Sequence, residues 1–328
     1  MTQHRQPRRP SFNRRQLLAA GGALGLHAWL GGFSPGAARA SEGDAATTVA
    51  KEAWAQIDKL DKNLWSVISD PLSGNFQTVC NGGIVAGSER VLAFDAFMGA
   101  DGAKWVAEQA KALTGRWPTD VVISHYHGDH VNGLAGFHLD GESPRVWVTD
   151  HTRKRAIKTA AERQRTDERR RAMLEGAEVL STDKPTRIDL GGRTVTLRPQ
   201  SGHTASDITL DLDEPSATFW GDLLWIGMFP NFMDASPSKL AASVREVRAR
   251  GAEHHISGHG PVATAETLDA YSNLLDHLEA AARTSHEKGQ APEEAAKTYK
   301  MPAATADWHL FQDTYFQTAI AAWHRELG

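Results

Sequence analysis

Cysteine is almost absent from the chain, whose 328 residues include only Cys80. A single cysteine cannot close a disulfide within the chain, and it cannot build a cysteine-based zinc site. The sequence beyond residue 40 also lacks the G-x-S-x-G elbow of many serine hydrolases, and nothing around Cys80 suggests an activated thiol. Any metal site must therefore be built from histidine and carboxylate side chains.

Acidic residues are missing from the first 40 positions, which contain six arginines. Arg14 and Arg15 precede an apolar stretch that runs to about Leu30, and Ala38-Arg39-Ala40 has the A-x-A form of a cleavage site. Glycines interrupt the stretch, which is too short to span a bilayer comfortably, so we favour cleavage after Ala40 over a membrane anchor. The segment resembles a twin-arginine signal, which implies contact with the twin-arginine export machinery and a periplasmic or otherwise exported bacterial protein.

Basic residues are outnumbered once this leader is removed. The chain has 36 basic and 40 acidic residues, and six of the basic ones lie in the leader. The mature chain would thus carry about ten negative charges. This balance argues against a nucleic-acid partner and leaves a small molecule as the expected substrate.

Apolar patterning predicts a mixed α/β chain. Strands are predicted at residues 64–68, 78–85, 91–94, 121–124, 146–148, 193–197, 208–212, 217–220 and 254–257. Helices are predicted around 105–113, from 152 to about 171, after Ser236-Pro237, and through most of the chain beyond residue 263. Residues 47–62 read as a helical or irregular preamble. The stretch from Arg153 to Arg171 holds nine basic residues, but interleaved acidic residues favour a solvated helix face over a binding patch.

The densest chemical signal is His125-Tyr126-His127-Gly128-Asp129-His130, directly after a predicted strand. Imidazole nitrogens and carboxylate oxygens are good zinc ligands, and a catalytic ion needs about three protein ligands and an open position. One short run cannot complete two such sites. Further candidates follow in Gly202-His203-Thr204, Gly221-Asp222 and Gly258-His259-Gly260-Pro261.

These four motifs, in this order, resemble those of the metallo-β-lactamase superfamily. The resemblance implies that His125, His127 and His203 hold a first metal. It also implies that Asp129, His130 and His259 hold a second, with Asp222 bridging the two. Asp95 matches a carboxylate that steadies the ligand loop. His254 and His255 have no counterpart and are expected to be structural.

The resemblance also implies an architecture, a four-layer αββα sandwich of the α/β (α+β) class with a C-terminal helical extension. We expect a signal peptide at 1–40, the preamble at 41–63, the metallo-β-lactamase-like domain at 64–263 and the extension at 264–328. Residues 69–76 and 225–233 would border the metals, either as an apolar substrate wall or as ordinary core.

The implied chemistry is that of a dinuclear hydrolase. Two Zn²⁺ ions, with iron or manganese as alternatives, would lower the pKa of a shared water and hold the hydroxide that attacks a carbonyl. Asp129 would orient this nucleophile. The substrate would be an ester, thioester, lactone or amide.

Two other readings stay open. β-Lactam hydrolases of the best-known type carry cysteine where this chain has Asp222, and often lysine where it has Trp225, so both departures count against antibiotic hydrolysis. Iron-dependent sulfur oxidoreductases share the fold, and related di-iron enzymes commonly replace the histidine at position 127, which is intact here. The sequence therefore favours hydrolysis.

Overall fold

The computed structural model describes residues 46–214 and 216–328. The twin-arginine segment expected at 1–40 lies outside these residues. Asp44 to Gly328 group into one compact unit, and none of the helices in the described part is long and apolar enough to cross a bilayer.

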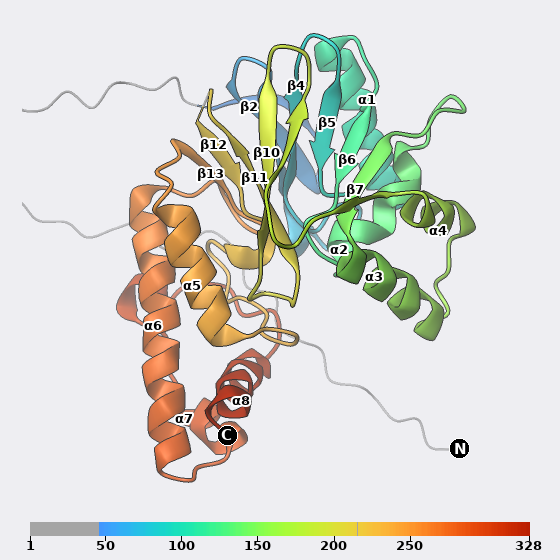
Figure 1. Ribbon diagram of the computed structural model, residues 1–328. Helices are drawn as coiled ribbons and strands as arrows, with labels where there is room; N and C mark the ends of the chain where they lie inside the picture. The colour runs from blue at the N-terminus through green and yellow to red at the C-terminus, as the bar shows by residue number, and fades with distance from the viewer. Residues whose placement is uncertain (1–45, 215) are drawn as a thin grey trace, which may run out of the picture. The chain divides into compact units, whose positions relative to one another are not determined.

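Two β-sheets form the centre of this unit (Figure 1). The first sheet has eight strands in chain order: β1 (Thr47–Lys51), β2 (Ala55–Asp61), β3 (Leu64–Ser69), β4 (Gly82–Ala86), β5 (Val91–Phe94), β6 (Asp120–Val122), β7 (Arg145–Thr149) and β8 (Glu178–Leu180). It is antiparallel from β1 to β5 and parallel from β5 to β8.

The second sheet has five strands in the order β13-β12-β11-β10-β9. They are β9 (Thr186–Asp189), β10 (Thr194–Gln200), β11 (Asp207–Leu212), β12 (Ala217–Phe219) and β13 (His254–Ile256). Only β12 and β13 pair in parallel. The parallel ends of both sheets are therefore formed by strands that need long crossover connections, and such connections carry the functional loops of many α/β proteins.

An apolar core joins the facing sides of the two sheets. Leu92 and Phe94 of the first sheet share one buried cluster with Leu210 and Phe219 of the second. Gly83 of β4 permits this close contact, because a Cβ there would lie 2.1 Å from the ring of Phe219. The absence of a side chain at Gly83 thus lets the sheets approach.

Helices cover the sandwich on both sides (Figure 1). The helices are α1 (Ala100–Thr114), α2 (Gly128–Val131), α3 (Asp150–Glu162), α4 (Glu168–Glu175), α5 (Pro237–Arg248), α6 (Ala265–Glu287), α7 (Pro292–Thr298) and α8 (Tyr315–Leu327). Val106 and Ala110 of α1 and Leu174 of α4 are buried together with the outer side chains of the first sheet. Helices α5 to α8 pack in a separate apolar cluster with the segment from Trp220 to Ala235. The predicted α/β sandwich with C-terminal helices is confirmed.

The N-terminal preamble differs from the prediction, because residues 47–61 form β1 and β2 rather than a helical or irregular segment. Strand β1 is mostly exposed and has no apolar alternation. In β2 the alternation is masked by Asp58, which is buried and accepts hydrogen bonds from Thr48 Oγ1 (2.6 Å) and Gln56 Nε2 (2.8 Å). Pairing with β3 therefore decides the conformation.

The basic stretch also differs in detail, because it folds into two helices, α3 and α4, instead of one. The break between α3 and α4 ends at Asp167, whose side chain caps α4 by accepting a hydrogen bond from Arg170 N (2.8 Å). Arg153 and Arg171 pair with Asp150 and Glu175 along the solvated faces. The short strands β8 and β9 were not predicted.

Candidate metal centre

The loop after β6 carries the dense histidine run to one edge of the sandwich. Helix α2 begins within the run, so His127 lies at its start and His130 in its single turn. Asp95, at the end of β5, holds this loop: its carboxylate accepts hydrogen bonds from Ser124 N (2.8 Å) and Ser124 Oγ (2.9 Å). It also lies 2.8 Å from His130 Nδ1. Asp95 thus contacts the ligand loop as the resemblance implied.

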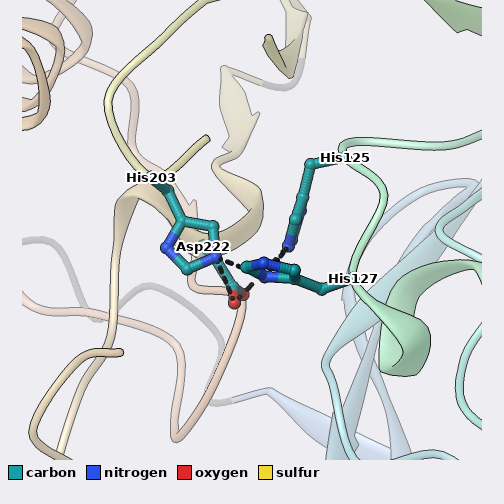
Figure 2. Close-up of side chains that lie close together, drawn as sticks. All are labelled: His125, His127, His203 and Asp222. Carbon is teal, nitrogen blue, oxygen red and sulfur yellow. Dashed lines mark hydrogen bonds and ion pairs between the residues drawn. The ribbon is translucent and has the colours of Figure 1, made fainter. Parts of the chain in front are cut away.

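The first group of side chains surrounds His127 (Figure 2). His127 Nδ1 lies 3.1 Å from His125 Nε2 and 2.9 Å from His203 Nε2. Asp222 Oδ2 lies 3.2 Å from His203 Nε2 and 3.7 Å from His125 Nε2. One atom from each of these four residues lies within 4.8 Å of all the others, which is a geometry that could hold one metal ion.

A second group lies on the other side of Asp222. It consists of Asp129, His130 and His259, whose ligand atoms also lie within 4.8 Å of one another. His259 Nε2 is 3.2 Å from Asp129 Oδ2. Asp222 Oδ1 lies 3.0 Å from His130 Nε2 and 3.4 Å from His259 Nε2. The two oxygens of Asp222 therefore face different groups.

All seven predicted site residues are brought together, although they come from four separate loops. His203 follows β10, Asp222 lies in a short 3-10 helix after β12, and His259 follows β13. Gly258 makes room for this convergence, because a Cβ there would lie 2.2 Å from Asp222 Oδ1. Gly258 of the Gly-His-Gly-Pro motif is therefore needed for close packing, in addition to the expected role of His259 as a ligand.

The electrostatics of the two groups differ. Burial lowers the pKa of His125 and takes that of His203 down to about 3, so these two imidazoles are neutral. In the second group, burial opposes protonation of His259, but Asp222 and Asp129 outweigh it and raise its pKa to about 9. The second group therefore attracts positive charge.

The donor set fits metal ions. Several buried ring nitrogens and one carboxylate oxygen have no hydrogen-bond partner among the described residues: His130 Nε2, His203 Nδ1, Asp222 Oδ1, His259 Nδ1 and His259 Nε2. Unpaired buried polar atoms are costly in a protein interior. Two of them, His130 Nε2 and Asp222 Oδ1, face each other at 3.0 Å inside the second group, where a cation would satisfy both.

Two carboxylates that sequence reasoning missed support the histidines. Asp234 Oδ2 lies 3.0 Å from His127 Nε2, the ring nitrogen that points away from the first group. Asp207 accepts hydrogen bonds from His203 N (3.0 Å) and from Thr204 N and Oγ1, which holds the loop that carries His203. Asp207 is the last residue of the Gly-His-Thr-Ala-Ser-Asp stretch at 202–207, so its place in this motif could have identified it. Asp234 lies in no recognisable motif.

The remaining sequence candidates lie outside the two groups. His255 accepts a hydrogen bond from Trp220 Nε1 (3.1 Å), and His254 belongs to β13 without joining either group. Burial raises the pKa of the Cys80 thiol to about 12, and its Sγ donates to the carbonyl of Asp129 (2.9 Å). A thiol in this state is a poor nucleophile.

A cavity of about 620 Å³ opens onto the metal centre. Four of the seven site residues line it, namely His127, Asp129, Asp222 and His259. Pro71, Leu72 and Phe76 come from the first predicted border segment, and Trp225 and Asn231 from the second. Both segments thus line the cavity. The ring of Trp225 also contacts that of His259, with ring centroids 3.9 Å apart and planes tilted by 32°.

The C-terminal part supplies a further wall that the sequence did not reveal. Phe311, Gln312 and Tyr315 line the same cavity. They are held by main-chain hydrogen bonds just before them, because His309 N donates to Gly227 O and Phe229 N donates to His309 O, both at 2.9 Å. The C-terminal extension therefore closes one side of the candidate site.

Comparison with solved structures shows this fold in an alkylsulfatase and in metallo-beta-lactamases. The inverting sec-alkylsulfatase Pisa1 from a Pseudomonas species has a TM-score of 0.66 and 15% identity, covering 84% of this chain and 50% of its own. A metallo-beta-lactamase from Hirschia baltica has a TM-score of 0.53 and 21% identity, covering 66% and 94%. The mono-zinc form of the metallo-beta-lactamase FIM-1 from Pseudomonas aeruginosa has a TM-score of 0.55 and 21% identity, and the match covers 68% of this chain and 95% of its own.

These identities establish the fold alone, and the chain spans half the length of the alkylsulfatase. No curated protein matches the chain. The family model of the metallo-beta-lactamase superfamily matches residues 76–268, which is more than half of the chain and includes all seven site residues. The chain therefore belongs to the metallo-beta-lactamase superfamily, and its His/Asp cluster could hold metal ions.

Proposed function

We propose that the protein is a hydrolase that holds two metal ions, with zinc as the expected element, and cleaves an ester, thioester, lactone or amide. The observation that carries this proposal is the carboxylate of Asp222, whose Oδ2 faces His125 and His203 while its Oδ1 faces His130 and His259. A carboxylate between two ligand groups can bind one metal ion through each of its oxygens, as in a two-metal site.

In the proposed assignment, the first ion is held by His125, His127, His203 and Asp222, and the second by Asp129, His130, His259 and Asp222. The bound ions would polarise the substrate carbonyl and make a coordinated water more acidic. The protein residues supply the ligands, their orientation and a partly enclosed cavity.

Asp129 is the residue to which we assign a catalytic role. Its carboxylate lines the cavity beside His259. Burial opposes ionisation, but His130 and His259 outweigh it and lower the pKa of Asp129 to about 2. Asp129 therefore stays ionised near neutral pH, and its Oδ atoms can orient an attacking water by accepting a hydrogen bond from it.

A substrate panel with metal quantification tests the proposal. We expect about two zinc ions per purified chain and turnover of at least one member among aryl esters, thioesters, lactones and β-lactams. Iron as the only metal, or no metal, would contradict it. Turnover of β-lactams above all others would instead support the antibiotic reading.

Two alanine variants test the ligand assignment. Asp222→Ala should lose the second metal and most turnover, because both groups lose a shared ligand. His254→Ala, a change in β13 outside the two ligand groups, should retain the second metal and the turnover. Equal losses in the two variants would refute the assignment.

Export is a separate proposal that rests on the sequence of residues 1–40. Mass spectrometry of the protein recovered from its host should give a mature chain that begins at Ser41. An intact leader on correctly folded, active protein would overturn it.

A further inference from the structure

Apart from the histidines of the metal centre, the described residues put no basic side chain on the walls of the cavity. Within residues 46–214 and 216–328, no lysine or arginine lines it. The polar groups that line it away from the metal centre, Asn231, Gln312 and Tyr315, are uncharged, so positive charge in the loaded site would come from the proposed metal ions and not from these walls. A carboxylate or sulfate on a substrate would therefore meet no arginine or lysine partner there.

Two arginines that contact neighbours of the site are already engaged. Arg155 lies over the ring of Tyr126, with its Cζ 5.5 Å from the ring centroid, and its charge also acts on Asp234. Arg170 donates to Asn132 Oδ1 (2.7 Å) and to the carbonyl of Arg165 (2.8 Å). Neither side chain is free to turn toward a substrate in the cavity without breaking these contacts.

Apolar side chains dominate the rim of the cavity. Leu72 and Phe76 are 55% and 62% exposed, although large apolar side chains normally avoid such exposure, and both line the cavity. Phe311 faces the same space from the C-terminal segment. Exposed apolar groups at a concave site usually mark the place where a ligand is desolvated.

We propose that the substrate is an uncharged carbonyl compound whose apolar acyl or alcohol group lies against Leu72, Phe76 and Phe311. Gln312, which is exposed on the C-terminal wall, helps to set selectivity because it leaves that wall uncharged. This inference rests on the hydrolase function proposed above and specifies its substrate class. It separates the protein from enzymes that must bind a carboxylate or sulfate through a basic side chain.

The volume of the cavity limits the apolar group. A space of about 620 Å³ lies within the range of small-molecule sites. Each methylene buried in such a site strengthens binding by roughly fourfold. In a series of 4-nitrophenyl esters, kcat/KM should therefore rise roughly fourfold per carbon from acetate to about hexanoate, and level off once the acyl chain fills the cavity.

A matched pair of substrates tests the charge selectivity. The 4-nitrophenyl ester of hexanoic acid and the mono-4-nitrophenyl ester of adipic acid have the same leaving group and similar chains, but only the second carries a carboxylate. We expect kcat/KM for the neutral ester to be higher by about tenfold or more, because the anion finds no partner. Equal rates, or preference for the adipate ester, would overturn the inference.

Binding without turnover gives a second readout. The unreactive ethers 4-nitrophenyl hexyl ether and its ω-carboxylate analogue should show the same preference in calorimetric titrations of the metal-loaded protein. Binding in which the carboxylated ether is equal or tighter would contradict the inference even if the kinetics agreed.

Two variants locate the selectivity. Gln312→Lys should reduce the neutral-to-anionic ratio about fivefold or more, because it places a cation on the wall. Asn273→Lys, exposed on α6 away from the cavity, adds the same charge and should leave the ratio unchanged. If both variants change the ratio equally, net charge and not the cavity wall is responsible, and the inference fails.

Phe311→Ala tests the apolar wall. It should lower kcat/KM for the hexanoate ester about tenfold and for the acetate ester less than twofold, with unchanged metal content. Equal losses on both esters would contradict the assignment of Phe311. Absence of metal and of all ester hydrolysis in the wild type would instead refute the underlying hydrolase function, so the two failures can be told apart.

Discussion

His127 faces the other histidines of the first group through one ring nitrogen and Asp234 through the other. Its Nδ1 faces His125 and His203, and its Nε2 lies 3.0 Å from Asp234 Oδ2. The hydrogen bond to His127 is the main reason that the pKa of Asp234 lies below its usual range, which keeps the carboxylate ionised. An ionised partner at Nε2 holds the proton there and leaves the Nδ1 lone pair for a metal.

This arrangement predicts that Asp234→Ala weakens metal binding or activity by about 10- to 100-fold, the usual range for such outer contacts. Asp234→Asn should lose less, because its amide oxygen can still accept a hydrogen bond from His127 Nε2–H. Metal titration of both variants beside Asp276→Asn, an exposed change on α6, checks this. Wild-type affinity in Asp234→Ala would show that Asp234 is dispensable.

At the scale of the element, β2 belongs to the body of the first sheet. Ile57 is fully buried in the apolar cluster that includes Val106 and Ala110 of α1. Strand β2 pairs with β3 along six residue pairs. The segment is therefore part of the domain's core and would be missed by a boundary placed at residue 64.

Truncation of a side chain tests this placement. Ile57→Ala should lower the free energy of unfolding by about 2–5 kcal/mol, the range for large buried aliphatic residues. Val49→Ala, on the exposed strand β1, should change it by less than about 0.5 kcal/mol. Denaturant unfolding followed by circular dichroism measures both, and a negligible effect of Ile57→Ala would mean that β2 contributes little to the core.

The elements differ in how well the sequence predicts them, and the reasons are physical. Strands β10 and β11 were predicted because their apolar residues, such as Leu197 and Leu210, face a buried layer. Strand β2 was missed because the buried Asp58 obscures its pattern. The site residues could be predicted because their four motifs, in this order, resemble those of the metallo-β-lactamase superfamily. Asp234 and Phe311 could not be found, since only tertiary contacts bring them to the centre.

At the scale of the whole molecule, metal binding is coupled to pH and to stability. The pKa of His259, about 9 without metal, is above its unfolded value. Its protonation therefore stabilises the metal-free fold fully below about pH 6.5, and this stabilisation is lost as the pH rises through about 9. A metal ion must displace the same proton, so metal affinity rises with pH over this range.

The difference in melting temperature between zinc-loaded and chelator-treated protein should therefore widen from pH 6.5 to 9. Calorimetric scans at several pH values, with and without a chelator, measure it. A difference that is constant or that narrows with rising pH would be inconsistent with a metal on His259.

The seven-residue metal centre is tested most directly by anomalous diffraction at the zinc absorption edge from crystals of the metal-loaded protein. We predict two peaks about 3.5–4 Å apart, one among His125, His127 and His203 and the other among Asp129, His130 and His259, with one oxygen of Asp222 directed at each. No peak at the cluster, or a single peak that Asp222 does not contact, would contradict the dinuclear assignment.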